Sequence, residues 1–236
     1  MKYKNYIEHY KNDAEFYDFF NLSIFSRQEY QRRYQTMFNL HEIKKNENIL
    51  EVGSGGSHAL EFIKSSKYYP LDISTHNLKK MKNIYSRVFF PVSGNVYNLP
   101  FEADSFDLII LSEVLEHLDN PEKALRQIYR VLKKNGSFVI SVPYKEVLSY
   151  QICIHCNQIT PTNAHLHSFD EDNLESLLNE IGFNIIKRTK CLNKISNRLY
   201  VNILLKRLPF KCWRLIDRLF NYITDKPASL MFLCNK

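Results

Sequence analysis

Long apolar runs are missing from this sequence. The N-terminal segment lacks the apolar stretch of a secretion signal, and no later segment is long enough to span a bilayer as a helix. The five cysteines are an odd number in a chain without such a signal, which favours free thiols in a reducing compartment. We therefore expect a cytoplasmic protein.

Internal repeats and low-complexity stretches are also absent, and 236 residues suit one α/β domain better than two. Hydrophobic residues make up 44% of the chain, which is enough for a core. The net charge of +7 favours anionic partners such as nucleic acid, a phosphorylated metabolite or a membrane surface. Because recognisable nucleic-acid-binding modules are missing, we expect no sequence-specific nucleic acid partner.

Short apolar runs alternate with helix signatures from residue 48 onward. Asn120 and Pro121 begin a helix that would end just before Gly136, and another helix runs from near Asp170 to Gly182. Strands that alternate with helices predict βαβ units and a largely parallel sheet. The seven expected strands are residues 48–52, 68–73, 87–92, 106–111, 137–142, 183–189 and 229–234.

A glycine-rich turn comes after the first expected strand. Residues 49–57 read Ile-Leu-Glu-Val-Gly-Ser-Gly-Gly-Ser, and they lead into an expected helix around residues 59–63. Glycine lets the backbone turn tightly and approach a ligand, and parallel sheets bind ligands at the carboxyl ends of their strands. A dinucleotide fingerprint would need a third glycine where His58 stands, which argues against the alternative of a nicotinamide-dependent oxidoreductase. Glu51, two residues before the first glycine, suits a ligand that carries an amino group and a positive charge.

Four motifs resemble those of class I S-adenosylmethionine (SAM)-dependent methyltransferases, in particular their small-molecule, methyltransferase type 11-like branch. The first is Glu51-Val-Gly-Ser-Gly, with Ser57 where the family usually has a third glycine. The second is the acidic Asp72 at the end of the second expected strand, which by itself could also cap a helix. In the third, Asn95 replaces an aspartate ahead of Leu-Pro-Phe. Residues 105–118 match the family's fourth strand and the turn after it, and the block that starts at residue 131 matches the approach to its fifth strand.

The resemblance covers residues 47–189 and the final strand. It implies an α/β fold: a Rossmann-like, doubly wound, mostly parallel seven-stranded sheet with helices on both faces, an N-terminal helical cover and an insertion after strand five. It also implies SAM as cofactor, with Glu51 at the methionine end and Asp72 on the ribose. The full set of implied cofactor-binding residues is Glu51, Gly53, Ser54, Gly55, Asp72, Ile73, Asn95, Val96, Ser112 and Glu113.

We treat residues 1–236 as a single methyltransferase domain with four parts. Residues 1–45, dense in tyrosine and phenylalanine, would form the helical cover. Residues 46–143 would bind the cofactor, and residues 144–168 would be the insertion or lid. Residues 169–236 would hold a basic amphipathic segment and the last strand.

Histidines are the candidate catalytic residues, because a base with a pKa near neutrality helps to methylate a hydroxyl or a carbon acid. His117, after the fourth strand, is the first candidate, although it could equally lie on a solvated turn. His165 and His167, at the end of the insertion, are the others. The expected acceptor is a small molecule or a lipid-like compound, methylated at oxygen, with carbon and nitrogen left open. The alternative is a SAM-fold protein that binds a partner without catalysis.

A metal site is a further hypothesis. Cys153 and Cys156 form a C-x-x-C, and with His165 and His167 they could hold a structural zinc ion that pins the insertion. A redox pair of cysteines and cysteines without any ligand are the alternatives.

The segment from Lys187 to Arg218 contains ten lysines and arginines and one acid, Asp217. Within it, helical spacing groups Phe210, Trp213, Ile216 and Phe220 on one face and Lys211, Arg214 and Arg218 on another. A basic amphipathic helix can lie on an anionic membrane, so residues 198–222 would allow a peripheral membrane contact. The alternative is a helix that docks on its own domain and leaves a solvated basic face.

Overall fold

One seven-stranded sheet forms the centre of the protein. The computed structural model describes residues 6–86, 88–154 and 157–236. The strand order is β3-β2-β1-β4-β5-β9-β8, in which only the pairs of β9 with β5 and with β8 are antiparallel. This arrangement confirms the predicted Rossmann-like, mostly parallel sheet. Its strands are β1 (Asn48–Val52), β2 (Lys67–Asp72), β3 (Val92–Ser93), β4 (Phe106–Ser112), β5 (Leu132–Pro143), β8 (Asn184–Asn193) and β9 (Pro227–Asn235).

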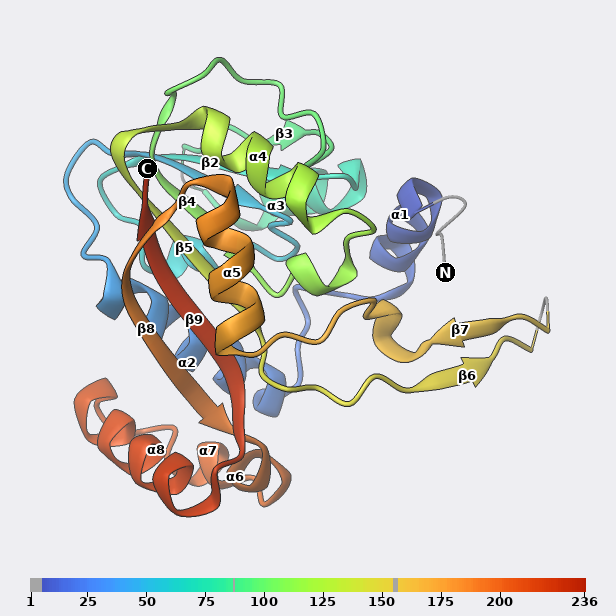
Figure 1. Cartoon of the computed structure of the whole chain (residues 1–236), viewed down its shortest axis with the longest axis vertical. Coiled ribbons are helices and arrows are strands. Elements are labelled where there is room, and N and C mark those ends of the chain that lie inside the picture. The colour runs from blue at the N-terminus through green and yellow to red at the C-terminus, as the bar shows by residue number, and fades with distance from the viewer. Residues whose placement is uncertain (1–5, 87, 155–156) are drawn as a thin grey trace.

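Helices cover both faces of this sheet, as the resemblance implies (Figure 1). The α-helices in the described ranges are α1 (Tyr6–Phe16), α2 (Ile24–Leu40), α3 (Thr75–Ile84), α4 (Pro121–Val131), α5 (Glu171–Ile181), α6 (Lys194–Arg198), α7 (Val201–Leu204) and α8 (Phe210–Thr224). The short 3-10 helices in these ranges are η1 (His58–Glu61), η2 (Leu115–His117) and η3 (Thr162–Ala164).

Alternating strand residues supply the two halves of the core. Leu50 and Val52 of β1 face a cluster that contains the apolar sides of α4 and α5. Ile49 faces a second cluster that contains residues of α2, α3 and η1 together with Trp213 of α8. Because side chains alternate along a strand, Glu51 points to the same face as Ile49, toward α2. The sheet geometry thus places an acidic residue under the N-terminal cover.

Local capping signals set the bounds of α4 and α5. The side chain of Asn120 accepts a hydrogen bond from the Lys123 amide, and Asp170 and Asn173 form a reciprocal capping box. Gly182 ends α5 with a φ of 109°, as predicted. The predicted end of α4 near Gly136 is wrong, because α4 ends at Val131 and the chain enters β5 at once.

Gly136 instead lies where the register between β4 and β5 shifts. A Cβ atom there would lie 2.8 Å from Leu132 Cδ1, so the glycine relieves crowding within the strand.

Two other expected elements are shorter than predicted. The strand expected at residues 87–92 is reduced to β3, Val92–Ser93. The helix expected at residues 59–63 is the single turn η1, whose preceding residue, Ser57, has a left-handed φ of 51°. The Ser57 hydroxyl lies 3.0 Å from the hydroxyl of Tyr68 in β2, so this segment is hydrogen-bonded to the neighbouring strand.

The insertion leaves the sheet as a separate hairpin. Tyr144 and Phe169 are bridged, so both ends of residues 144–168 lie together. Between them, β6 (Tyr150–Ile152) pairs with β7 (Ile159–Pro161), and Figure 1 shows this hairpin extending away from the central sheet. No helix in the described parts of the chain has both the length and the apolarity needed to cross a membrane.

Candidate functional site

The glycine turn lies at the carboxyl end of β1, where the sequence predicts a ligand site. The amides of Gly53 and Ser54 both donate to the Leu71 carbonyl of β2, which holds the turn between the two strands. Gly53 and Gly55 have φ values of 70° and 47°, a conformation that favours glycine. A Cβ atom on Gly53 would lie only 2.6 Å from Val114 Cγ2, so the turn packs directly against the chain segment after β4.

Glu51 is 1% exposed and takes hydrogen bonds from two tyrosines. The hydroxyl of Tyr34, in α2, and that of Tyr68, in β2, each donate to one of its carboxylate oxygens. Burial raises the pKa of Glu51 to about 7, against the lowering effect of the two hydroxyls. Burial and the nearby Glu51 raise the pKa of both tyrosines well above 10. The sequence motif indicated Glu51 but gave no sign of its two partners.

Asp72 lies at the carboxyl end of β2, on the other side of the turn. Its Oδ2 accepts from the Gly55 amide and its Oδ1 from the Ser74 amide, each at 2.8 Å. Burial raises the pKa of Asp72 and the backbone donors lower it. The N-cap of α3 is Ser74, so helix capping does not explain the position of Asp72. Ile73, between them, comes directly after the end of β2.

Asn95 and Val96 lie beyond β3, on the same edge of the sheet. The Asn95 side-chain oxygen accepts a hydrogen bond from the Tyr97 amide at 3.0 Å. Val96 is buried against the core cluster of α4 and α5. The carbonyl oxygen that the sequence assigned to an adenine contact thus already accepts a hydrogen bond from the backbone.

Ser112 and Glu113 form a polar network where β4 ends. The Ser112 hydroxyl lies 3.1 Å from that of Ser141 in β5, which lies 2.9 Å from Glu113 Oε1. Arg33 of α2 places its Nε 3.5 Å from the same Glu113 oxygen. Burial lowers the pKa of Arg33, but Glu113 together with Tyr30 and Glu29 outweighs this effect and the pKa is raised. The sequence gave no sign of Arg33, since it lies far before Glu113 in the chain with no motif around it.

His117 and His165 come together, as a shared catalytic role requires. Their ring centroids lie 4.6 Å apart and the rings are nearly perpendicular. Burial and the neighbouring His165 lower the pKa of His117 to about 4. His167 has a different partner: its Nε2 lies 2.8 Å from the Leu118 carbonyl oxygen.

The residues expected to bind zinc are only partly described. Cys153 is at the tip of the hairpin, where its amide donates to the Gln158 carbonyl, while Cys156 lies outside the described residues. Among the residues that the structure describes, the group that could hold a metal ion is Glu116, His117 and His165. It shares only His165 with the expected set, and the zinc site stays a prediction.

Residues before α2 cover the glycine turn. The ring of Phe19 lies 3.5 Å from the position of a Cβ on Gly55, and its carbonyl oxygen lies 2.5 Å from that of a Cβ on Gly56. Lys80 of α3 pairs with Asp18 at 2.7 Å and lies over the ring of Phe20. The aromatic composition of the N-terminus indicated a cover, but not that its backbone would contact the turn.

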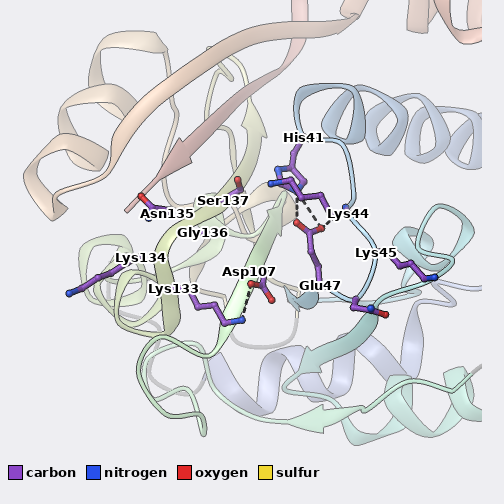
Figure 2. Close-up of a pocket in the computed structure, with 11 residues that line it drawn as sticks. His41, Lys44, Lys45, Glu47, Asp107, Lys133, Lys134, Asn135, Gly136 and Ser137 are labelled. Atoms are coloured by element: carbon purple, nitrogen blue, oxygen red, sulfur yellow. Dashed lines mark hydrogen bonds and ion pairs between the residues drawn. The ribbon is translucent and has the colours of Figure 1, made fainter.

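A separate polar pocket lies at the opposite edge of the sheet, near the amino ends of β1 and β4 (Figure 2). Its two acids have structural partners. Asp107 accepts from Lys133 at 2.8 Å and from the Asn48 amide at 2.9 Å, and Glu47 accepts from the Lys44 amide at 2.9 Å. This pocket is therefore distinct from the site at the glycine turn, and Asp107 has a structural role at the entry of β4.

A family described as "Methyltransferase domain" matches residues 24–188. The chain belongs to the class I SAM-dependent methyltransferase family. The matched residues include the glycine turn, Asp72, the end of β4 and the insertion. The nicotinamide-dependent oxidoreductase alternative is thereby overturned.

Curated relatives agree with this membership. The ubiquinone/menaquinone biosynthesis C-methyltransferase UbiE of Pseudoalteromonas translucida is 31% identical over 151 residues, covering 56% of this chain and 58% of that protein. The mitochondrial ubiquinone biosynthesis O-methyltransferase of Rattus norvegicus is 29% identical over 152 residues, covering 58% of this chain and 44% of that protein. The chain thus spans about half the length of the curated relatives it matches.

The methyltransferase fold is also that of solved structures. The 1,6-didemethyltoxoflavin-N1-methyltransferase of Burkholderia thailandensis, solved with 1,6-didemethyltoxoflavin and S-adenosylhomocysteine, superposes with a TM-score of 0.65. The match covers 100% of this chain and 91% of that one at 15% identity, which establishes a shared fold.

Proposed function

We propose that this chain transfers the methyl group of SAM to a small-molecule or lipid-like acceptor, at an oxygen atom. The observation that carries the proposal is the meeting of four features at one edge of the sheet. The glycine turn, the buried carboxylates Glu51 and Asp72, and the chain after β4 all lie at the carboxyl ends of neighbouring parallel strands. Ligands of open α/β sheets bind at this edge.

The chemistry of the turn fits SAM. The Ser54 hydroxyl is buried and has no hydrogen-bond partner among the described residues, so a polar ligand atom would satisfy it. Glu51 and Asp72 supply two carboxylates, one suited to a cationic ligand end and one to ribose hydroxyls. In this assignment Gly53, Ser54 and Gly55 approach the cofactor through their backbone, and Ile73, Asn95 and Val96 line its adenine end.

SAM supplies a methyl group that is already activated by its sulfonium. The chain therefore has to align the acceptor and exclude water. Ser112 and Glu113, held by Ser141 and Arg33, form the floor beside the transferred methyl. Phe19 and α1 close the site from the other side.

The acceptor side contains His117 and His165. Tyr10 of α1 has its ring 5.9 Å from that of His117, so the N-terminal cover reaches this pair. A His117 pKa of about 4 makes it a weak base at neutral pH, which favours a positioning role for its neutral imidazole. His167 would first have to release the Leu118 carbonyl to take part.

A lipid-like acceptor is supported by a second surface. Leu215, Leu219, Tyr222 and Ile223 of α8 are all exposed, while Lys211 and Arg218 are exposed on the same helix. The α8 helix leads into Pro227, and β9 begins beside the carboxyl end of β5, on the active edge of the sheet. We assign to residues 198–222 a peripheral contact with an anionic membrane, next to the entrance for the acceptor. The names of both curated relatives, which refer to ubiquinone biosynthesis, are in keeping with such an acceptor.

The first experiment is calorimetric titration of the purified chain with SAM, S-adenosylhomocysteine and NADH. We expect the two adenosyl ligands to bind and NADH not to bind. Asp72→Ala should weaken SAM binding about 5- to 150-fold, the equivalent of about 1–3 kcal/mol for lost hydrogen bonds to a charged group. The control is Asp107→Ala, which removes a carboxylate at the opposite edge and should leave the affinity unchanged.

Unchanged SAM binding by a folded Asp72→Ala variant would refute the ribose assignment. SAM binding without methyl transfer to any hydroxylated, lipid-like acceptor would instead favour the non-catalytic partner protein. The absence of SAM binding to the folded wild type would overturn the proposed function.

A further inference from the structure

We propose that Glu116, His117 and His165 bind a divalent transition-metal ion on the acceptor side of the site. One possible ligand atom from each residue lies within 4.8 Å of the other two. Glu116 and His117 come from η2, directly after β4, and His165 comes from the end of the insertion. The amides of Leu166 and His167 both donate to the Glu116 carbonyl, at 2.7 and 3.2 Å, which holds these two distant segments together.

The Glu116 carboxylate is the strongest sign of a missing cation. Its residue is 1% exposed, and neither carboxylate oxygen has a hydrogen-bond partner among the described residues. His117 Nε2 lies 3.9 Å from Oε1. A buried carboxylate without partners is costly, and native proteins pair such groups or use them to coordinate metals.

The two imidazoles are held in the tautomer that a metal site needs. His117 Nδ1 lies 3.3 Å from the Ala164 carbonyl, which can only accept, so Nδ1 carries the proton and Nε2 the lone pair. That Nε2 is the atom that faces Glu116. His165 Nδ1 is hydrogen-bonded to the Glu146 carboxylate, which likewise leaves Nε2 as its ligand atom. A carboxylate behind a histidine is the usual outer support of a metal ligand.

Two imidazole nitrogens and one carboxylate oxygen select the kind of ion. Imidazole suits zinc and iron better than it suits magnesium or calcium, which prefer all-oxygen sites. Three ligands bound to one ion at about 2.0–2.2 Å lie about 3.3–3.8 Å apart. Since the present ligand atoms lie within 4.8 Å of one another, ion binding would draw them together by roughly 1 Å. Three protein ligands leave positions open for an exogenous oxygen.

The role of the ion rests on the proposed function. A metal ion at this position would bind the acceptor hydroxyl and favour loss of its proton to solvent. The oxygen then forms the bond to the methyl carbon, and the carbon–sulfur bond of SAM breaks with its electron pair on sulfur.

The test is metal binding by the chelator-treated whole chain, followed by calorimetry with Mn²⁺ and Zn²⁺ and by the electron paramagnetic resonance of Mn²⁺. We expect one ion per chain. Glu116→Gln and His165→Gln should each weaken binding at least tenfold, and Glu146→Gln should weaken it about 10- to 100-fold through the outer support. The control is His76→Gln, which changes an exposed histidine on α3 and should have no effect.

Circular dichroism checks that each variant is folded. Glu116→Gln keeps the size of the side chain, so it separates the loss of a ligand from the loss of packing. Wild-type affinity in folded Glu116→Gln and His165→Gln would overturn the assignment, as would the absence of Mn²⁺ and Zn²⁺ binding in the wild type. SAM titrated on the same sample keeps the two proposals separate, since SAM binding without metal binding refutes only the metal site.

Discussion

Three buried carboxylates in this chain have three different hydrogen-bonding environments. Glu51 accepts from two tyrosine hydroxyls, Asp72 accepts from two backbone amides, and Glu116 has no hydrogen-bond partner among the described residues. In each, burial is the largest effect on the pKa and raises it. Neutral hydrogen-bond donors can stabilise a buried carboxylate before a cationic ligand binds. A buried carboxylate without such donors needs a bound cation for its stabilisation.

Glu51 should make the stability of the protein depend on pH. Its pKa is raised from 4.5 to about 7 on folding, so the folded state binds the proton more tightly than the unfolded state. The resulting stabilisation is fully present below about pH 4.5 and is lost as the pH rises through about 7. Between pH 5 and 8, the free energy of unfolding of the wild type should fall relative to that of Glu51→Gln by on the order of 1–3 kcal/mol. Urea unfolding at a series of pH values measures this difference.

Asp72 and Glu116 have raised pKa values too, so only the difference between wild type and variant isolates Glu51. Glu61→Gln, an exposed acid in η1, is the matched control and should follow the wild-type curve. If the free energies of unfolding of wild type and Glu51→Gln changed in parallel with pH, Glu51 would have the same pKa in the folded and unfolded states.

At the scale of elements, α8 differs from the helix that the sequence predicts. Trp213 is buried, as expected for the apolar face, but Arg214, expected on the solvated basic face, is also buried. Its guanidinium pairs with Asp217 and donates to the Lys190 carbonyl at 2.8 Å, so the predicted pattern of basic residues on this helix is wrong at that position. The face left to solvent is largely apolar, with lysine and arginine at its sides. Such a face suits insertion into a membrane surface better than solvation alone.

Leu219→Glu should weaken the membrane contact that we assign to α8. Leu219 is 56% exposed in the middle of the apolar face, so a carboxylate there would have to enter the anionic lipid surface. In flotation with vesicles that contain phosphatidylglycerol, we expect the wild type to bind and Leu219→Glu to lose most of that binding. Neutral vesicles should bind the wild type less, because Lys211 and Arg218 then have no anionic partner.

Ile84→Glu places the same change on an exposed residue of α3 and serves as the control. A wild type that stays with the unbound fraction would rule out the membrane contact, and equal flotation of both variants would place it elsewhere on the molecule.

At the scale of the whole molecule, α2 joins the N-terminal cover to the C-terminal helices. Arg32 is 2% exposed, donates to the Leu205 and Leu208 carbonyls at 3.0 and 3.1 Å, and lies 5.0 Å from the centre of the Trp213 ring. The next residue of α2, Arg33, reaches Glu113 at the floor of the site. Two successive residues of α2 therefore contact two regions: Arg32 contacts the C-terminal helices proposed to face a membrane, and Arg33 contacts the proposed catalytic site.

Arg32→Ala should loosen the packing of α8 through Trp213 and lower the free energy of unfolding by about 2–3 kcal/mol, because two partly buried carbonyls lose a charged donor. Trp213 is the only tryptophan, so its fluorescence reports this change directly. We expect red-shifted emission from the folded variant and a lower urea midpoint. Arg27→Ala, an exposed arginine on the same helix, should change neither. Unshifted emission with wild-type stability would show that Arg32 does not hold the two parts together.

The positions of most strands along the chain, and the prediction of a ligand site at their carboxyl ends, arise from local patterns. Apolar runs, the N-caps of α4 and α5 and the glycine turn are features of neighbouring residues, so a single sequence reveals them. The errors also have local causes. Gly136 resembles a helix-ending glycine but lies in β5, where the register with β4 shifts. Ser57 adopts a left-handed conformation and is followed by the single 3-10 turn η1, where a helix was expected.

The sequence by itself determined the family and predicted a carboxyl-edge site with the acids Glu51 and Asp72, since each belongs to a short contiguous motif. Only the tertiary structure decided what those residues contact. Tyr34, Tyr68 and Arg33 reach the site from other elements, and His165 meets Glu116 and His117 from a distant part of the chain. Such contacts depend on which elements pack together, and no spacing along the chain encodes them. The proposed metal-binding group could therefore be found only after the insertion was seen to return beside the end of β4.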